Sequence, residues 1–255
     1  MKVLVFGGGI HAHRYVESLL WTKHEIHICG INVQGKSQDL SNQYNLPYIS
    51  IGDLNINNVN DYDLFVIGIA LSGKQKIIMK LINELKYKNS MIIDKPLCIN
   101  KQEMENYSGN LLRPLKSYAL VCQRDFDQDY YHIEQANSYH IKWYAITDNL
   151  VHNIEDRLPH LLSWLMLEIG NNIFLKKEHS YLSGSLNGSE LIISFIKSEN
   201  HGVEINNTWY KSPDYRSLNS KIVEKVYNFN KEDSINNMNR AIAVTKIICN
   251  LLEER

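Results

Sequence analysis

Three polar side chains in this sequence are placed where they could transfer protons. Lys95 follows the short apolar run 91–93, and Pro96 disfavours helical geometry at Lys95, so its ammonium would project from the end of a strand. Asp156 and His160 are four residues apart and would share one face of a helix. Because ammonium, imidazole and carboxylate groups all serve as general acids and bases, these three residues are the candidate catalytic groups.

Each of these residues also has a purely structural interpretation. Lys95 could be an exposed lysine ahead of a helix, and His160 could be a buried core histidine. Pro159 is tolerated only in the first turn of a helix, so Asp156 could simply cap that helix. The residue types leave open whether Lys95 or His160 moves the proton.

A glycine-rich turn near the amino terminus is the second chemical signal. It follows the apolar run 2–6 and fits the pattern G-x-G-x-x-G/A. Between a strand and a helix, such glycines let backbone N–H groups approach a pyrophosphate, which the amino terminus of the helix stabilises. The alternative is a tight turn without a ligand. The motif predicts a dinucleotide site formed by Gly7, Gly8, Gly9, Ile10, His11 and Ala12.

The residues after the second expected strand bear on which dinucleotide binds. An NAD site usually has a carboxylate about 20 residues after the glycines, where it holds the ribose hydroxyls. Residues 29–37 include none, whereas Gln34, Lys36 and Ser37 offer hydrogen bonds and a positive charge suited to a 2′-phosphate. We therefore favour NADP over NAD, with a solvated loop lysine as the alternative for Lys36. Ala70, after the third long strand, is also expected to contact the cofactor.

These residues need a scaffold of alternating strands and helices. Short β-type runs alternate with longer helical stretches through the first half of the chain. We expect strands over residues 2–6, 25–30, 64–69, 91–93 and 117–122, and helices over 12–22, 38–44, 74–85 and 101–108. This rhythm predicts a Rossmann-type α/β domain at residues 1–123, a doubly wound parallel sheet of five strands.

The second half has a different pattern. One helical segment, 157–168, is followed by alternating segments at 174–186, 190–197 and 203–210. An amphipathic stretch over 234–252 predicts a closing helix. Residues 124–255 are therefore expected to form a smaller α+β domain with a mainly antiparallel sheet, through which two copies could pair as a homodimer.

Three segments resemble the Gfo/Idh/MocA family of oxidoreductases. Asp94-Lys95-Pro96 resembles the family's Glu-Lys-Pro signature, and residues 123–127 are similar to its Asn-Arg-Arg-Phe segment. Asp156 and His160 match its Asp-x-x-x-His pattern ahead of a helix with tryptophan. The resemblance implies that Lys95 binds substrate near the nicotinamide and relays a proton, that Asp156 orients the substrate, and that His160 is the acid or base.

The sequence departs from the family in four respects, which include the lack of a Gly-Gly pair before Asp156 and the small size of the second domain. Asp94 stands where the family has glutamate, and the segment 70–75 lacks the family's histidine. Residues 33–37, 45–48 and 72–74 are similar to the thiazolinyl imine reductases, which are NADPH enzymes of the same superfamily. Substrates with a C=O bond and substrates with a C=N bond therefore both stay open.

Composition excludes several other classes of protein. A net charge of −1 provides no broad basic surface for nucleic acid, and the longest apolar stretch, 64–71, is too short to cross a membrane. Four widely spaced cysteines suit a reducing cytoplasm. The histidine pairs 11/13 and 24/27 lack the further ligands of a metal site. We expect a small-molecule substrate and no nucleic acid, membrane or metal.

Together these features predict an enzyme that transfers a hydride between NADP, or NAD, and a carbonyl, alcohol or imine carbon. Its substrate would be a small metabolite such as a sugar, a polyol or a cyclic imine. The alternative is a protein that binds the dinucleotide without catalysis, as a sensor or scaffold in a biosynthetic pathway. The presence of Lys95 and His160 favours the enzyme.

Overall fold

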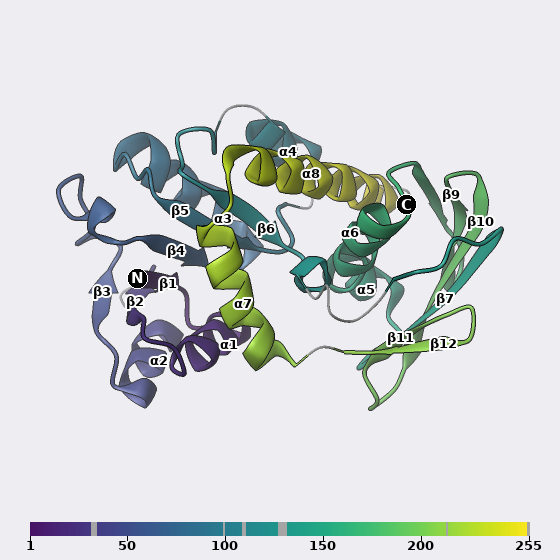
Figure 1. The fold of residues 1–255 in the computed structure, drawn as a ribbon, viewed down its shortest axis with the longest axis horizontal. Coiled ribbons are helices and arrows are strands. Elements are labelled where there is room, and N and C mark those ends of the chain that lie inside the picture. Colours follow the sequence, from purple (N-terminus) through teal and green to yellow (C-terminus); the bar gives the residue numbers. More distant parts are fainter. Residues whose placement is uncertain (32–34, 99, 109–110, 127–131, 213, 254–255) are drawn as a thin grey trace. The chain divides into compact units, whose positions relative to one another are not determined.

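The chain divides into two compact units in the computed structural model, which describes residues 1–31, 35–98, 100–108, 111–126, 132–212 and 214–253 (Figure 1). The first unit comprises Met1–Cys98, Gln102–Val121 and Tyr215–Ile242. The second comprises Ile99–Lys101, Cys122–Asp214 and Ala243–Arg255. A single boundary after residue 123 therefore does not describe the chain, because Tyr215–Ile242 returns to the first unit.

A six-stranded parallel sheet forms the centre of the first unit, in the order β3-β2-β1-β4-β5-β6. The strands are β1 (Lys2–Phe6), β2 (Glu25–Gly30), β3 (Tyr48–Ser50), β4 (Leu64–Ile67), β5 (Ser90–Asp94) and β6 (Tyr118–Val121). The predicted doubly wound α/β class is confirmed. The strand β3 was not predicted, because it has only three residues and all are half-buried.

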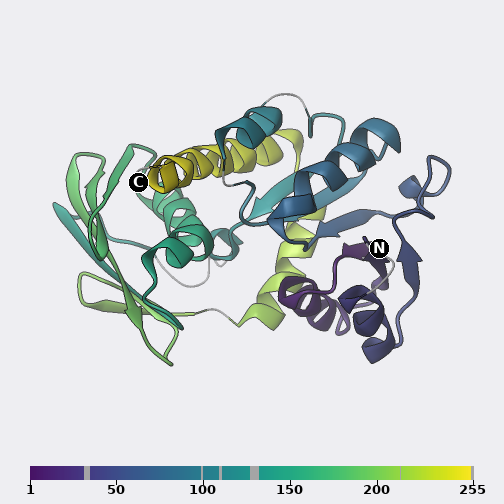
Figure 2. The same ribbon diagram turned by 180° about the vertical axis from the view of Figure 1, so that it is seen from behind.

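Helices cover both faces of this sheet, since β4, β5 and β6 are buried along their whole length. The helices are α1 (Ile10–Leu19), α2 (Lys36–Tyr44), α3 (Leu71–Met79), α4 (Lys101–Ser108) and α7 (Tyr215–Tyr227), with a π-helical turn, η2 (Lys80–Glu84), directly after α3. The helix α7 was not predicted from the sequence. It packs beside α1. Figure 2 shows these elements from behind. The buried residues Leu218, Ile222 and Val226 of α7 repeat at intervals of four.

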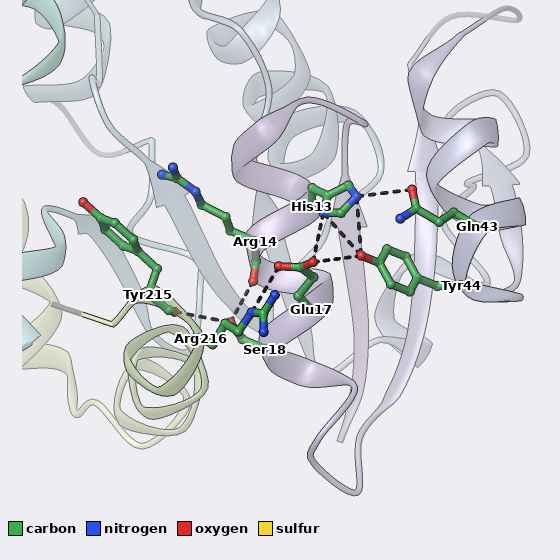
Figure 3. A network of polar contacts seen from close by, with 8 residues as sticks. All are labelled: His13, Arg14, Glu17, Ser18, Gln43, Tyr44, Tyr215 and Arg216. Atoms are coloured by element: carbon green, nitrogen blue, oxygen red, sulfur yellow. Dashed lines mark hydrogen bonds and ion pairs between the residues drawn. The ribbon is translucent and has the colours of Figure 1, made fainter. Parts of the chain in front are cut away.

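Polar side chains on α1 link it to α2 and α7 (Figure 3). Tyr44 donates a hydrogen bond to Glu17 Oε1 at 3.1 Å, and Arg216 Nε lies 3.6 Å from Glu17 Oε2. Ser18 Oγ donates to the carbonyl of Arg14 at 2.7 Å. Burial and the bond to Glu17 raise the pKa of Tyr44. The exposed ion pair between Arg216 and Glu17 is expected to stabilise the protein little.

The second unit contains a mixed sheet in the order β12-β11-β7-β10-β9-β8. Its strands are β7 (Ser138–Ala145), β8 (Ile173–Lys177), β9 (Tyr181–Leu186), β10 (Ser189–Lys197), β11 (Gly202–Ile205) and β12 (Thr208–Lys211). Only β7 and β10 pair in parallel, so the predicted mainly antiparallel sheet is confirmed. The segments 174–186 and 203–210, predicted as continuous, are hairpins; Asn206 and Asn207 have positive φ and form a two-residue turn between β11 and β12.

Three helices accompany this sheet: α5 (Leu150–Asp156), α6 (Leu158–Glu168) and the second half of α8 (Lys231–Glu253). α6 is almost entirely buried, and its Leu161, Trp164 and Leu165 join a core with Val244 and Ile248 of α8. The seven-residue α5 was missed because it is too short to show a hydrophobic period. Among the described residues, no helix combines the length and apolar character needed to span a bilayer.

Candidate active site

A cavity of about 540 Å³ lies at the carboxyl ends of β1, β2 and β4. The strand order reverses between β1 and β4, and open α/β sheets bind their ligands at such a position. The volume is within the usual range for small-molecule sites. The cavity is lined by Gly7, Gly8, Gly9, Ile31, Gly35, Lys36, Ser37, Gly68, Ile69 and Ala70.

Each glycine of the turn has a different spatial reason to lack a side chain. Gly7 has a φ of +103°, and a Cβ there would lie 2.9 Å from the carbonyl oxygen of Gly68. A Cβ on Gly8 would lie 2.1 Å from the carbonyl carbon of Lys36, so the first turn of α2 rests directly on the glycine turn. Gly9 has no atom within 4 Å of its Cβ position and presents open backbone.

Ala12 ends the glycine motif and lets α1 approach β4 closely. A Cβ on Gly68, the residue after β4, would lie 3.2 Å from the backbone nitrogen of Ala12. Both positions therefore need small residues, which is the packing role of the last position in the motif.

The amino terminus of α1 fits a pyrophosphate. Its N-cap residue, Gly9, makes no side-chain capping bond, and the first turn of the helix has no acidic residue. The first N–H groups of the helix therefore lack a side-chain acceptor, and its partial positive charge is not offset by a carboxylate. A diphosphate would supply both acceptors and negative charge.

The structure separates the expected cofactor residues into three sets. Gly7, Gly8, Gly9, Lys36, Ser37 and Ala70 line the cavity. Ile10, His11 and Ala12 form the first turn of α1 and are not among its lining residues. Gln34 lies outside the described residues. Lys36 is the first residue of α2 and exposed, so it belongs to a helix rather than to a loop. None of the described lining residues is acidic.

Lys95 directly follows β5, on the same edge of the sheet as the cavity, and its side chain is 5% exposed. The preceding Asp94 is also buried and pairs with His11, whose Nδ1 lies 3.1 Å from Asp94 Oδ2. This pair joins the helix of the glycine turn, α1, to the last residue of β5, directly before Lys95.

A buried residue that the sequence analysis did not select, Lys74, lies beneath this segment. Its Nζ donates hydrogen bonds to the carbonyl oxygens of Asp94 at 2.5 Å and Pro96 at 2.9 Å. Burial lowers the pKa of Lys74 to about 8. The available signal was helical spacing, because Lys74 shares a face of α3 with the buried Ile77 and Ile78.

In the second unit, Asp156 and His160 lie on consecutive helices. Asp156 is the last residue of α5, and its Oδ2 lies 3.0 Å from Nε of Arg157, the single residue that separates α5 from α6. The interpretation of Asp156 as the cap of α6 is wrong, because Arg157 occupies that position. His160 is the third residue of α6, is 6% exposed, and donates its backbone N–H to the carbonyl of Arg157. Pro159 lies in the first turn, as expected.

A second polar pair lies one turn further along α6. Ser163 Oγ donates a hydrogen bond to Asp125 Oδ2 at 2.6 Å, and both side chains are buried. Asp125 belongs to the 3₁₀ turn η3 (Gln123–Phe126), which packs on α6. The segment of Asp125 resembles a family motif, but no local pattern indicates its partner, because Asp125 and Ser163 are 38 positions apart.

Two other histidines noted in the sequence, His13 and His27, have local partners. His13 lies 3.7 Å from Glu17 Oε1, and His27 Nε2 lies 2.8 Å from Glu25 Oε1. The part of the chain that the structure describes contains no group of three or more potential metal ligands.

An all-parallel sheet in this order, with a glycine turn and an uncapped helix at its switch point, defines a Rossmann-type fold. No protein-family model and no curated protein matches the sequence. Solved structures do resemble the chain over nearly its whole length.

A myo-inositol dehydrogenase from Corynebacterium glutamicum has a TM-score of 0.70 at 12% identity, covering 99% of this chain and 96% of that one. A Gfo/Idh/MocA family oxidoreductase from Vibrio cholerae has a TM-score of 0.67 at 13% identity, covering 99% and 97%. The WlbA (WbpB) dehydrogenase from Thermus thermophilus, solved in complex with NAD and α-ketoglutarate, has a TM-score of 0.68 at 9% identity, covering 100% and 96%. The chain thus has the fold of Gfo/Idh/MocA-type oxidoreductases, as the motifs predicted.

Proposed function

We propose that this protein is a cytoplasmic, nicotinamide-dependent oxidoreductase acting on a carbonyl, alcohol or imine carbon of a small metabolite. The observation that carries the proposal is the arrangement at one sheet edge in the first unit. There a cavity lined by Gly7, Gly8 and Gly9 adjoins an uncapped helix, and the buried Lys95 follows a strand of the same edge. The four cysteines are buried and widely spaced in the sequence, which suits a reducing compartment.

In this proposal the residues of the cavity divide the work of holding the cofactor. The glycine turn and the amino terminus of α1 hold the pyrophosphate. Lys36 and Ser37, the first two residues of α2, hold the 2′-phosphate, and NADP is therefore preferred over NAD. The bound nicotinamide supplies or accepts the hydride.

The protein's own part in the chemistry is to bind the substrate and move its proton. Lys95 binds the oxygen or nitrogen of the reacting carbon and relays a proton, and its burial keeps water from competing for that contact. Asp156 orients the substrate and His160 serves as acid or base. The sugar, polyol and cyclic imine classes all present such a group.

Calorimetric titration with NADPH and with NADH tests the cofactor assignment. The wild type is compared with Lys36→Ala and with Lys76→Ala, which removes an exposed lysine of α3. We expect NADPH to bind more tightly than NADH, and only Lys36→Ala to remove the difference. If neither nucleotide binds, the oxidoreductase proposal fails.

A turnover screen tests the catalytic part separately. NADPH oxidation and NADP reduction are followed with panels of sugars, polyols, keto acids and cyclic imines. Turnover that Lys95→Met lowers by about a hundredfold or more supports the enzyme. A protein that binds NADPH tightly but turns over no member of any panel is a dinucleotide-binding sensor or scaffold, and the proposal of an enzyme is then wrong.

We also propose that two copies pair through the outer face of the second unit's sheet. Phe174, Tyr181 and Trp209 lie on this face and are 55%, 38% and 44% exposed, since their strand neighbours Leu175, Leu182 and Tyr210 point into the core. Light scattering should show a dimer for the wild type and for Ile56→Asp, a change at an exposed residue of the first unit. It should show a monomer for Phe174→Asp combined with Tyr181→Asp. A monomeric wild type contradicts this pairing.

A further inference from the structure

Lys74 is the most unusual side chain at the carboxyl edge of the first sheet. It is 1% exposed, although lysine is almost never fully buried without a specific partner. Its neighbours on the same face of α3, Ile77 and Ile78, are ordinary core residues. An apolar residue would pack at position 74 without removing an ammonium group from water, so packing alone gives no reason for a lysine.

The ammonium of Lys74 donates two hydrogen bonds to the backbone around Lys95. The acceptors are the backbone carbonyls of Asp94 and Pro96, the residues immediately before and after Lys95. One ammonium group therefore holds the backbone on both sides of Lys95. Because α3 supplies Lys74 and β5 leads into Lys95, the contact fixes the Lys95 segment to a rigid helix.

The charges around Lys74 fit this role. The Asp94 carboxylate stabilises its ammonium, and that carboxylate is itself held by His11. The positive charge of Lys95 has the opposite effect and helps to lower the pKa of Lys74. The carboxylate that stabilises the charge of Lys74 thus belongs to Asp94, the residue directly before Lys95.

We propose that Lys74 is a positioning residue that holds the backbone of the segment 94–96 and so aims the side chain of Lys95 at the substrate. The part that concerns substrate rests on the function proposed above. Lys74 touches neither the substrate nor the cofactor in this assignment, because it is 1% exposed and its ammonium is bonded to the backbone carbonyls of Asp94 and Pro96.

The test compares Lys74→Met, which keeps the length and loses the donors, with Lys76→Met on the exposed side of the same helix. In Lys74→Met we expect kcat to fall at least tenfold, while the Kd for NADPH changes less than twofold. The double variant Lys74→Met/Lys95→Met should turn over no more slowly than Lys95→Met alone, because Lys74 acts only through Lys95. Lys76→Met should match the wild type throughout.

A second readout does not depend on turnover. The rate at which an amine-acylating reagent modifies Lys95 is followed by peptide mass spectrometry well below the melting temperature of each variant. A loosened segment should make Lys95 react several-fold faster in Lys74→Met and leave it unchanged in Lys76→Met. Lys74→Gln, which keeps a donor, replaces Lys74→Met if the latter does not fold, and should give an intermediate rate.

The two proposals fail in different ways. If the wild type turns over no substrate, the proposed function fails, and faster acylation of Lys95 in Lys74→Met still supports the positioning role. If both kcat and the acylation rate are unchanged in Lys74→Met, Lys74 is only a core residue and the inference is overturned. A loss of kcat that adds fully to that of Lys95→Met also overturns it.

Discussion

The two sheets of the molecule differ in the surface that each offers to a ligand. In the first unit, β4, β5 and β6 are buried along their whole length, whereas in the second unit β7 and β10 alternate between buried and less buried residues. A strand that is buried on both faces offers chemical groups only at its ends. A strand with one open face offers every second side chain along its length.

This difference explains where the candidate groups lie. In the first unit they come directly after strands: Gly7 after β1, Gly68 after β4 and Lys95 after β5. The second sheet carries polar side chains along its open face, such as Lys142 on β7, which pairs with Glu204 on β11 at 2.7 Å. We therefore expect substitutions at strand ends of the first sheet to affect function most, and substitutions on the open face of the second to affect it little.

The largest effect is expected from Lys95→Met. Removing a group that transfers a proton typically costs about 10²- to 10⁴-fold in rate, and we expect a loss of turnover in that range. Lys142→Met, the matched change on the second sheet, should retain wild-type turnover. Steady-state rates at saturating NADPH measure both. Equal losses in the two variants would break the comparison.

The next largest effect is a difference in the stability lost when Gly8 or Gly202 is replaced by alanine. Gly8→Ala would place a Cβ 2.1 Å from the backbone of Lys36, which is fixed in α2, and should destabilise the protein by about 1–3 kcal/mol and weaken dinucleotide binding. At Gly202 of β11 a Cβ would meet the tip of the Trp209 ring at 2.3 Å. That exposed side chain can swing away, so Gly202→Ala should cost less than about 1 kcal/mol.

Urea unfolding of the two alanine variants, with NADPH titrations beside it, provides the measurement. A larger loss of unfolding free energy in Gly202→Ala than in Gly8→Ala would mean that the glycine turn yields more easily than the open sheet. The expectation that the carboxyl edge of the first sheet tolerates substitution less well than the open face of the second sheet would then be wrong.

The contrast also explains what the sequence could predict. Strands buried on both faces read as continuous apolar runs, and the glycine motif has a fixed spacing, so the first sheet and its cavity follow from local patterns. Lys95 could be selected because it directly follows such a run. The class of the second sheet was predicted as well. Its hairpin turn at Asn206 and Asn207 was not, although this polar pair interrupts the alternating pattern.

The remaining features depend on contacts distant in sequence. Lys74 lies 20 residues before its first acceptor, and Ser163 lies 38 residues after Asp125. No local pattern encodes either pair. The return of α7 to the first unit is of the same kind, because its buried face needs a partner, α1, that lies about 200 residues earlier.

A smaller effect is expected for the cofactor preference of the first unit. Lys36→Ala should weaken NADPH binding roughly tenfold, about 1.4 kcal/mol, because Lys36 is exposed and its pairing with a phosphate is partly screened by water. NADH lacks that phosphate, so its binding should not change. Equal weakening of both nucleotides would assign Lys36 to the shared part of the dinucleotide instead.

The smallest effect is a pH dependence that also distinguishes the two units. Burial lowers the pKa of Lys74 to about 8, below its value in the unfolded chain, so above pH 8 the unfolded chain binds more protons and stability rises with pH. Relative to Lys74→Met, the wild type should gain about 1 kcal/mol between pH 7 and pH 9. The hydrogen bond from Lys142 to Glu204 raises the pKa of Lys142. The difference in stability between the wild type and Lys142→Met should therefore show no such rise between pH 7 and pH 9. Urea unfolding at several pH values measures both stability differences. If the two change equally with pH, the prediction that burial lowers the pKa of Lys74 is wrong.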